Sequence, residues 1–282
     1  MKLGFSLSPG GLLLPYHLGA IGALQDQGCI LDENVVVGGS SAGAIATMAY
    51  GTGLDPVDLL EATINVSDQC YQLGKARGNL LPLLQKEMND RVGDKEFLYL
   101  QEEQQNTIGI AYTEVFPRRK SFLQKEFDTK DDLFRAVSWS CMFPFFATPW
   151  PALLDTSSSD GFLPRVMVDG YFSVPRERFG CPELDDVDRT IAISVFPKDR
   201  IKMDAFADED CISPNPEESC FSMQDLFRLA TEASSREELT NVFEAGWKDA
   251  EGWCNKEMNR QNTLEKRNRE LQREIDDDDD DF

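Results

Sequence analysis

The chain of 282 residues carries 28 Lys and Arg against 50 Asp and Glu, which gives a formal net charge of −22 at pH 7. Such an acidic chain excludes nucleic acid as an expected partner and disfavours adsorption to anionic lipid, because phosphate groups are bound by clustered Lys and Arg. Hydrophobic residues make up 41% of the chain, but no apolar run reaches the roughly 18 to 20 residues of a membrane span, so we expect a globular protein without a transmembrane segment.

The first fifty residues contain the order strand, glycine-containing turn and helix twice. Residues 3–7 form the first expected strand, which ends at the glycine loop Ser8–Gly11 and is followed by a helical pattern over 16–27. Residues 34–37 are the second expected strand, with a helix over 42–50 behind it. Apolar strands alternating with helices predict an α/β fold whose central sheet is mostly parallel.

Further elements follow along the chain. We expect helices over 55–64, 82–88 and 130–139, and strands over 107–112, 121–127, 166–168 and 190–196. The strands 107–112 and 121–127 are close enough in sequence to form a hairpin.

After Pro197 the composition changes to loop-like residues over 204–219, followed by helical periodicity over 222–244. We therefore predict a first domain over 1–200, a helical extension over 201–258 and a charged helical or disordered tail over 259–282. Asp276–Asp281 is a run of six aspartates, which predicts a solvated, disordered end, with metal binding as the alternative.

The segment with the clearest chemical meaning is Gly39-Ser40-Ser41-Ala42-Gly43, which contains the pattern G-x-S-x-G between an expected strand and an expected helix. A tight turn of this kind exposes its serine and requires small neighbours, because the backbone is crowded. The start of the following helix supplies N–H groups and a positive dipole end near a developing oxyanion. Ser41 is therefore the candidate nucleophile, and Ser40 is the weaker alternative.

A serine nucleophile needs a base. His17 is the only histidine, and it precedes Ser41 inside an expected helix, where a structural role is expected. The base is then a carboxylate or a lysine. Asp169 is the best candidate, because residues 166–168 place it at the carboxyl end of a buried strand, and Gly170 allows close approach of another backbone or a substrate.

The glycine loop after the first strand, Ser8-Pro9-Gly10-Gly11, is the third element. Adjacent glycines at a junction between strand and helix can direct N–H groups at one point, as an oxyanion hole or a phosphate-binding nest. Its spacing does not match a dinucleotide-binding fingerprint, and a plain turn is the alternative.

These elements together resemble the patatin-like phospholipase family over residues 3–197. The landmarks that carry the resemblance are the glycine loop, Tyr16–Gly19, Gly39–Gly43, 108–113, 133–144 and Asp169-Gly170, in that order. The resemblance implies a three-layer α/β/α fold and a catalytic first domain. It further implies a Ser41–Asp169 dyad without histidine, an oxyanion hole at Gly10 and Gly11, and hydrolysis of acyl esters of phospholipids, galactolipids or acylglycerols through an acyl-enzyme. Such chemistry needs no cofactor and no metal.

The chain departs from the family pattern in three places. Pro9 and Leu12–Leu14 alter the glycine loop, Tyr171 stands where a second glycine follows the acid, and the family's Asn-x-Pro is represented by Ser173–Pro175. These departures motivate a second hypothesis, a catalytically weak lipid-binding or scaffold protein with the same fold. A histidine-dependent hydrolase and a transacylase are further alternatives.

Two other features bear on substrate and location. An aromatic cluster, defined as Trp139, Phe143, Phe145, Phe146 and Trp150 together with Leu12–Leu14, predicts an acyl-chain channel, a surface that dips into lipid, or ordinary core packing. Seven cysteines without a CxxC pair and one histidine predict free thiols in a reducing compartment and no zinc site. Residues 1–4 carry no secretory signal pattern, so we expect a cytoplasmic protein or one peripheral to a membrane or lipid droplet.

Overall fold

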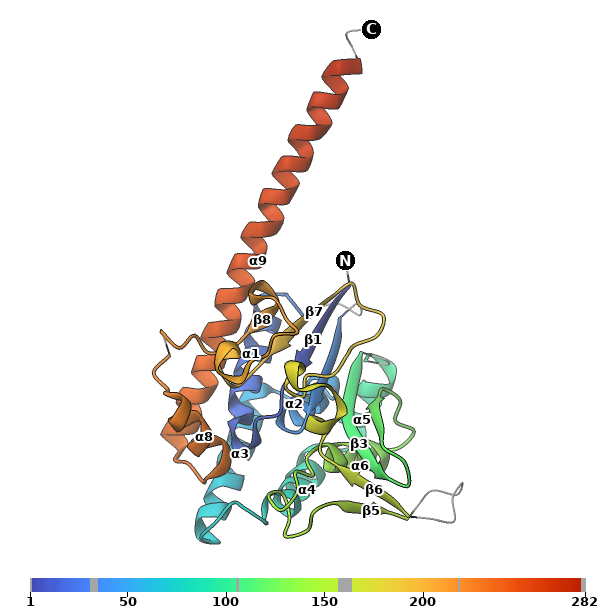
Figure 1. Ribbon diagram of the computed structural model, residues 1–282, viewed down its shortest axis with the longest axis vertical. Helices are drawn as coiled ribbons and strands as arrows, with labels where there is room; N and C mark the ends of the chain where they lie inside the picture. The colour runs from blue at the N-terminus through green and yellow to red at the C-terminus, as the bar shows by residue number, and fades with distance from the viewer. Residues whose placement is uncertain (1, 31–34, 105–106, 157–163, 218, 280–282) are drawn as a thin grey trace.

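The computed structural model describes residues 2–30, 35–104, 107–156, 164–217 and 219–279, without the side chains of 264–266 and 268–279. It is a mixed α/β fold in which a central sheet is flanked by helices (Figure 1). The α/β class predicted from the alternation of apolar strands and helices is therefore confirmed.

The sheet has the strand order β5-β6-β3-β2-β1-β7-β8, and β4 pairs with β3 outside this path. Its strands are β1 Leu3–Leu7, β2 Val36–Ser40, β3 Ile108–Phe116, β4 Lys120–Gln124, β5 Leu153–Asp155, β6 Arg165–Val168, β7 Arg189–Ile193 and β8 Cys211–Ile212. The ladders among β3, β2, β1, β7 and β8 are parallel, whereas those of β3 with β4 and β6 and of β6 with β5 are antiparallel.

The helices are α1 Leu14–Asp26, α2 Ala42–Gly51, α3 Pro56–Gln72, α4 Leu80–Arg91, α5 Asp94–Glu102, α6 Lys130–Ser140, α7 Lys198–Ile201, α8 Met223–Thr231 and α9 Arg236–Asp279. Short 3-10 helices are η1 Gly11–Leu13, η2 Gly170–Ser173, η3 Arg176–Arg178 and η4 Asp208–Asp210. Several helices begin at a polar cap: Asp55 accepts from the first turn of α3, and Thr129 and Ser222 form capping boxes at α6 and α8.

Alternate residues of β1 separate the two faces of the sheet. Phe5 is directed to the helical face, where its ring lies 5.9 Å from that of Trp253 on α9. Its neighbour Ser6 is directed to the other face and donates a hydrogen bond of 2.8 Å to the carbonyl of Pro182. Both side chains are fully buried, so the connection after η3 covers the sheet opposite α1, α2 and α9.

Helix α1 packs against α9 with almost no space between the backbones. A Cβ at Gly19 would lie 2.0 Å from the carbonyl oxygen of Phe243, and a Cβ at Gly246 would lie 2.0 Å from that of Tyr16. The Tyr16 hydroxyl also donates to Asp249 at 2.7 Å. The first part of α9 is thus packed into the body, while its later part extends away from it (Figure 1). The expected division of the chain at residue 200 stays a prediction.

The structure differs from the sequence expectations in several elements. The helix expected over 222–244 is two helices, because Ser235 and Glu238 form a new cap between them. α5 and β5 were not predicted, and β8 lies inside the expected loop 204–219. Asn34 lies outside the described residues. The side chains of Asp276–Asp281 do too, so the expected disorder of this run stays a prediction.

Candidate active site

The turn between β2 and α2 has the crowded backbone that the G-x-S-x-G pattern predicts. Ser41 adopts φ 54° and ψ −119°, a conformation that side chains rarely occupy. A Cβ at Gly39 would lie 2.3 Å from the carbonyl of Gly43, and one at Gly43 would lie 2.6 Å from the carbonyl oxygen of Leu7. Only glycine fits at both positions, and the strained turn holds the Ser41 side chain out toward the cavity.

Asp169 reaches Ser41 because β2 and β6 meet end to end along one edge of β3. β4 pairs with β3 over residues 110–114 and occupies one edge of β3 there. β2 and β6 also pair with β3 within this range, so both must use the other edge. β2 occupies that edge over 108–111 in parallel, and β6 occupies it over 113–116 in the antiparallel direction. The carboxyl ends of β2 and β6 therefore point at each other. Asp169 follows a strand, as predicted. That strand is antiparallel to β3, so it is not one of the parallel strands whose carboxyl ends were expected to form the site.

The end of α6 holds both candidate catalytic residues. The Ser41 N–H donates to the Ser140 hydroxyl at 2.9 Å, and the Asp169 N–H donates to the Met142 carbonyl at 3.0 Å. A single turn thus fixes the backbone of both residues. Sequence reasoning missed the role of Ser140, although it lies within the segment 133–144 that carries part of the family resemblance.

The Asp169 carboxyl group is fully buried beneath Ser41. Burial raises its pKa to about 7, and this rise is opposed by the hydrogen bond from the Tyr171 N–H and by the Ser41 hydroxyl. Oδ1 accepts from the Tyr171 N–H at 2.8 Å. Among the described residues, Oδ2 has no hydrogen bond of ordinary geometry, so the Ser41 hydroxyl is near the carboxylate without a tight bond to it, as is common in sites without substrate.

Gly170 makes the close approach of the two strand ends possible. A Cβ there would lie 2.3 Å from the Ala111 carbonyl oxygen and 2.9 Å from the Ser40 side chain. Ser40, the alternative nucleophile, is fully buried and donates a hydrogen bond of 2.5 Å to the carbonyl of Gly180. Its hydroxyl therefore has a structural partner and is closed to substrate.

The glycine loop lies on the wall of the same cavity as Ser41, with Gly10 and Gly11 both exposed to that cavity. Gly11 has φ +57°, and a Cβ there would lie 2.3 Å from the carbonyl oxygen of Ala230. The loop leads directly into η1 and α1, so its N–H groups precede the first hydrogen-bonded turn and have no partner within that helix.

His17 supports this loop and does not reach Ser41. Burial lowers the pKa of His17 to about 4, so the ring is neutral, and its Nε2 lies 2.7 Å from the Ser8 carbonyl oxygen. Because a carbonyl oxygen only accepts, Nε2 carries the proton and donates it. The ring lies outside the lining of the cavity. This arrangement gives His17 the structural role that the sequence predicted.

Ala42 adds a further N–H group that sequence reasoning did not single out. It is the first residue of α2 and lines the cavity beside Ser41. The N–H groups of a first helical turn have no acceptor inside the helix. The Ser41 N–H is already bonded to Ser140, so the N–H groups of Ala42 and of the glycine loop, which line the same cavity, are the candidates for binding an oxyanion.

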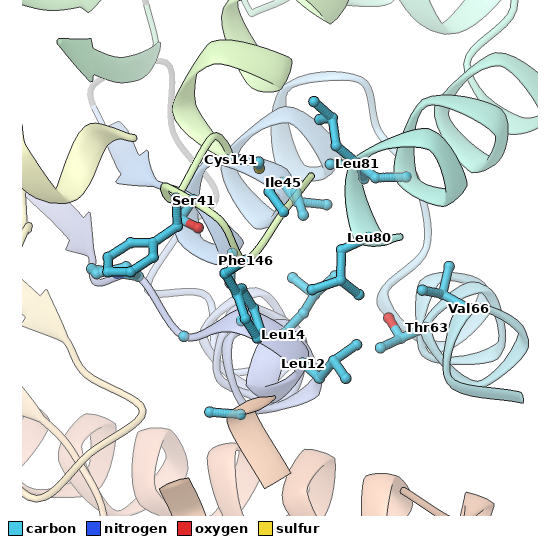
Figure 2. Close-up of a pocket in the computed structure, with 18 of the residues that line it drawn as sticks. Leu12, Leu14, Ser41, Ile45, Thr63, Val66, Leu80, Leu81, Cys141 and Phe146 are labelled. Atoms are coloured by element: carbon cyan, nitrogen blue, oxygen red, sulfur yellow. The ribbon is translucent and has the colours of Figure 1, made fainter. Parts of the chain in front are cut away.

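Beside Ser41 the structure has a cavity of about 690 Å³ with a mostly apolar wall. Ser41 lies at one end and Val66 at the other, and between them are Leu12, Leu14, Leu80 and Phe146 (Figure 2). The wall comes from the glycine loop and α1, α2, α3 and α4. A chamber of this size and character suits a long hydrocarbon chain.

The aromatic cluster named from the sequence divides into three groups. Phe143 and Phe146 line the cavity together with Leu12 and Leu14. Trp139 and Leu13 are core residues. Phe145 and Trp150 are 51% and 69% exposed, so they belong neither to the cavity nor to the core.

Across the part of the chain that the structure describes, no three His, Cys, Asp or Glu side chains are grouped to hold a metal ion. Within the same residues no helix has the length and apolar character to cross a membrane.

Comparison with known proteins gives one matching family and several similar solved structures. The family model described as patatin-like phospholipase matches residues 5–179. No curated protein matches the sequence. Among solved structures, VipD from Legionella pneumophila is similar with 13% identity and a TM-score of 0.44, covering 89% of this chain and 67% of that one.

Two further solved structures are similar. One is the ExoU–SpcU complex from the type III secretion system of Pseudomonas aeruginosa, with 16% identity, a TM-score of 0.45 and coverage of 90% of this chain and 52% of that one. The other is the type III effector protein ExoU, with 17% identity, a TM-score of 0.47 and coverage of 90% of this chain and 53% of that one. The chain spans about half the length of these two proteins.

Proposed function

This chain belongs to the patatin-like phospholipase family, and from that premise we propose that it is a serine lipid acyl hydrolase with Ser41 as nucleophile and Asp169 as base. One observation supports this most strongly: the strained serine and the buried carboxylate converge at one end of an apolar cavity. Membership of the family supplies the general activity on lipid esters. The dyad and its steps are the proposal.

In the first half of the reaction, the Ser41 Oγ attacks the acyl carbonyl carbon while its proton passes to Asp169. A carboxyl group whose pKa lies near 7 can both take and return a proton at neutral pH. The negative charge that develops on the carbonyl oxygen is stabilised by the N–H groups of Gly10, Gly11 and Ala42. The bond to the alcohol then breaks, and the leaving alkoxide takes the proton from Asp169.

In the second half, water attacks the Ser41 acyl ester. Asp169 takes a proton from that water, and the same N–H groups stabilise the second oxyanion. The fatty acid leaves, and Ser41 regains its proton from Asp169. Protons and charge balance without a metal or a cofactor.

The substrate proposed for this site is a lipid ester with at least one long acyl chain, drawn from phospholipids, galactolipids or acylglycerols. The chain would occupy the cavity between Ser41 and Val66, whose wall is mostly hydrocarbon. Contact with a membrane or a lipid droplet is expected for such substrates.

The test combines covalent labelling with turnover of a neutral ester. A fluorophosphonate should label the folded protein once, at Ser41, and Ser41→Ala should abolish both labelling and hydrolysis of a p-nitrophenyl ester. Asp169→Asn should reduce turnover about 10⁴-fold. Ser40→Ala is the matched control, because it removes a neighbouring hydroxyl that does not face the cavity.

Two results would replace the proposal. Equal turnover in wild type, Ser41→Ala and Asp169→Asn would remove the dyad. A folded protein that binds lipid but takes up no fluorophosphonate would favour the catalytically weak lipid-binding protein that the altered glycine loop suggests.

A further inference from the structure

A second cavity adjoins the one at Ser41 and has the opposite electrostatic character. It is lined by three basic side chains, Arg176, Arg200 and Lys202, and none of the Asp and Glu residues that the structure describes lines it. In a chain with a net charge of −22, a cavity whose described wall carries only basic charges needs an explanation. Its volume of about 820 Å³ is large enough for a polar head group.

The three basic side chains have no ion-pair partner among the described residues. Their neighbours in sequence are used differently. Lys198 forms an ion pair with Asp208, and Arg178 donates to the carbonyls of Cys181 and Pro182 at 3.0 Å each. Fold-stabilising contacts therefore account for Lys198 and Arg178, but they leave the cationic groups of the second cavity free for a ligand.

An aromatic wall is shared by the two cavities. Tyr171, Phe179 and Phe227 line both of them. Their rings are in contact in a series: Tyr171 lies 5.6 Å from Phe179, which lies 5.9 Å from Phe196, which lies 5.1 Å from Phe227. The wall begins beside the candidate base, because the Tyr171 N–H binds Asp169. The two cavities therefore meet at a wall that starts two residues after the candidate base.

From this arrangement we propose that the second cavity binds the phosphodiester head group of a phospholipid whose acyl chain occupies the first cavity. This inference rests on the proposed function and narrows its substrate class, since acylglycerols and galactolipids carry no phosphate. Arginine and lysine are the side chains that bind phosphate oxygens. In glycerophospholipids the phosphate is only a few bonds from the acyl esters, which fits two adjoining cavities with Ser41 near their boundary.

The test compares two lipids that share their acyl chains, phosphatidylcholine and diacylglycerol, in micelles of a neutral detergent. The variant Arg176→Gln/Arg200→Gln/Lys202→Gln should lose about tenfold in kcat/KM toward phosphatidylcholine, because three charge contacts from exposed side chains are removed. Its kcat/KM toward diacylglycerol should change less than about twofold. The control Lys86→Gln/Lys95→Gln/Lys248→Gln changes the net charge equally at exposed positions outside both cavities and should act like wild type on both lipids.

Equal losses on the two lipids, or an equal loss in the control, would overturn the head-group site. Inorganic phosphate separates the two possible sources of the anion. If phosphate inhibits wild type but not the triple variant, and the lipid preference also changes, the head-group assignment is supported. If phosphate inhibits while lipid preference is unchanged, the site binds free phosphate and the assignment is wrong.

Failure of this inference can be told apart from failure of the proposed hydrolase activity. Ser41→Ala protein should still bind micelles containing phosphatidylcholine more tightly than micelles containing diacylglycerol, and the triple substitution in that background should remove the difference. If the wild-type protein shows this binding pattern but has no esterase activity, the proposed hydrolase function is wrong and the head-group site is supported.

A separate observation concerns two thiols that hold the C-terminal helix. Cys29, which follows α1, and Cys254 on α9 have their Sγ atoms 2.9 Å apart, and both are free thiols. Cys29 is half-buried and Cys254 is buried. No other two cysteines are recorded in such contact among the described residues. We infer that this pair is a site of reversible oxidation that links α9 to the end of α1.

The step balances with a peroxide as oxidant. The Cys29 thiolate attacks the peroxide and becomes a sulfenic acid while hydroxide leaves, and the Cys254 thiol then displaces water to form the disulfide. Peroxide-treated full-length protein should yield a peptide joining residues 29 and 254, and its urea midpoint should rise because α9 is tied to α1. Cys254→Ser should give neither result, and Cys70→Ser, at another buried thiol, should give both. A treated wild-type protein without the 29–254 link would overturn the inference.

Discussion

The two ends of the cavity are built in different ways. At the Ser41 end, backbone touches backbone, and a single added Cβ at Gly39, Gly43 or Gly170 would lie within about 2.6 Å of another chain segment. At the far end, the wall consists of side chains of α3 and α4, with the ion pair of Arg91 and Glu87 at 3.1 Å among them. The proposed reaction centre is thus fixed by close backbone contacts, whereas the proposed space for the acyl chain depends on exchangeable side chains.

Asp169→Asn should produce the largest effects at the Ser41 end, and they have opposite signs. Activity should fall about 10⁴-fold, but the folded state should gain stability. The buried carboxyl has a pKa near 7 in place of 3.8, so its contribution to stability is full below pH 4 and is lost as the pH rises to 7. Ionising this buried carboxyl lowers the unfolding free energy of the wild type by on the order of 4 kcal/mol above pH 7.

Urea unfolding of wild type and Asp169→Asn at several pH values measures this directly. The variant should be more stable at pH 8, and its advantage should shrink toward pH 4. Asp225→Asn is the control, because an exposed helix cap holds the pKa of that carboxyl below its usual value, so this substitution should destabilise at neutral pH. An Asp169→Asn advantage that does not change with pH would contradict the buried-charge explanation.

Gly170→Ala tests whether the Ser41 end tolerates an added atom. Because its Cβ would lie 2.3 Å from the Ala111 carbonyl oxygen, the strand ends must separate. We expect a loss of about 3 kcal/mol in unfolding free energy and at least a 100-fold loss in kcat. Gly252→Ala is the control within α9, where a Cβ meets nothing within 4 Å, and it should raise stability by up to about 1 kcal/mol. Wild-type kcat in Gly170→Ala would show that the close contact is not needed.

The pH dependence of kcat/KM tests the base itself. Only the ionised form of Asp169 accepts a proton, so activity should fall tenfold per pH unit below about 7 and be constant above it. Between the plateau and pH 5 the loss should be about 100-fold with a neutral p-nitrophenyl ester. A plateau that extends down to pH 5 would show that the carboxyl ionises like an ordinary aspartate.

Ser140→Ala tests the positioning contact at the end of α6. Loss of the 2.9 Å bond from the Ser41 N–H should lower kcat about tenfold and leave KM unchanged, since the cavity is intact. Ser138→Ala, two residues earlier on the same helix, should keep wild-type kcat, because the Ser138 hydroxyl accepts from Gln85 and has no other partner among the described residues. Equal kcat values in the two variants would mean that Ser140 is not needed to orient Ser41.

Leu84→Phe should have the smallest effect on activity, and this effect should be limited to the end of the cavity proposed to hold the acyl chain. The larger ring shortens the cavity that Leu84 lines, so turnover of long-chain p-nitrophenyl esters should fall about fivefold while that of the acetate stays the same. The ratio of the two rates is the measurement. An equal fall with both esters would show that α4 affects the reaction centre and does not merely set chain length.

The same contrast explains how much the sequence could predict. Ser41, Asp169 and the glycine loop were found because each lies in a short motif whose local backbone is encoded by neighbouring residues. The structure brings Ser41, Asp169, Gly10 and Gly11 together, but Asp169 follows a strand antiparallel to β3 and not the parallel strand that the sequence argument assumed. Their catalytic roles stay proposals.

What the sequence did not reveal depends on pairing between distant segments. The contact of Ser140 with the Ser41 N–H joins residues 99 positions apart, and no local pattern signals it. The edge of β3 that β6 uses depends on β4 occupying the other edge. The interruption between α8 and α9 was hidden because Ser235 and Glu238 lie within an otherwise continuous helical periodicity.

The close contact between Gly19 on α1 and helix α9 matters for the choice of expression fragments. The loop that faces Ser41 leads into α1, and α1 is held in place by a helix more than 200 residues later in the chain. Trimming an expression fragment to the family match at residue 179 would uncover the buried face of α1. A fluorophore or affinity tag attached beyond Met258, where α9 leaves the body, would leave that face covered.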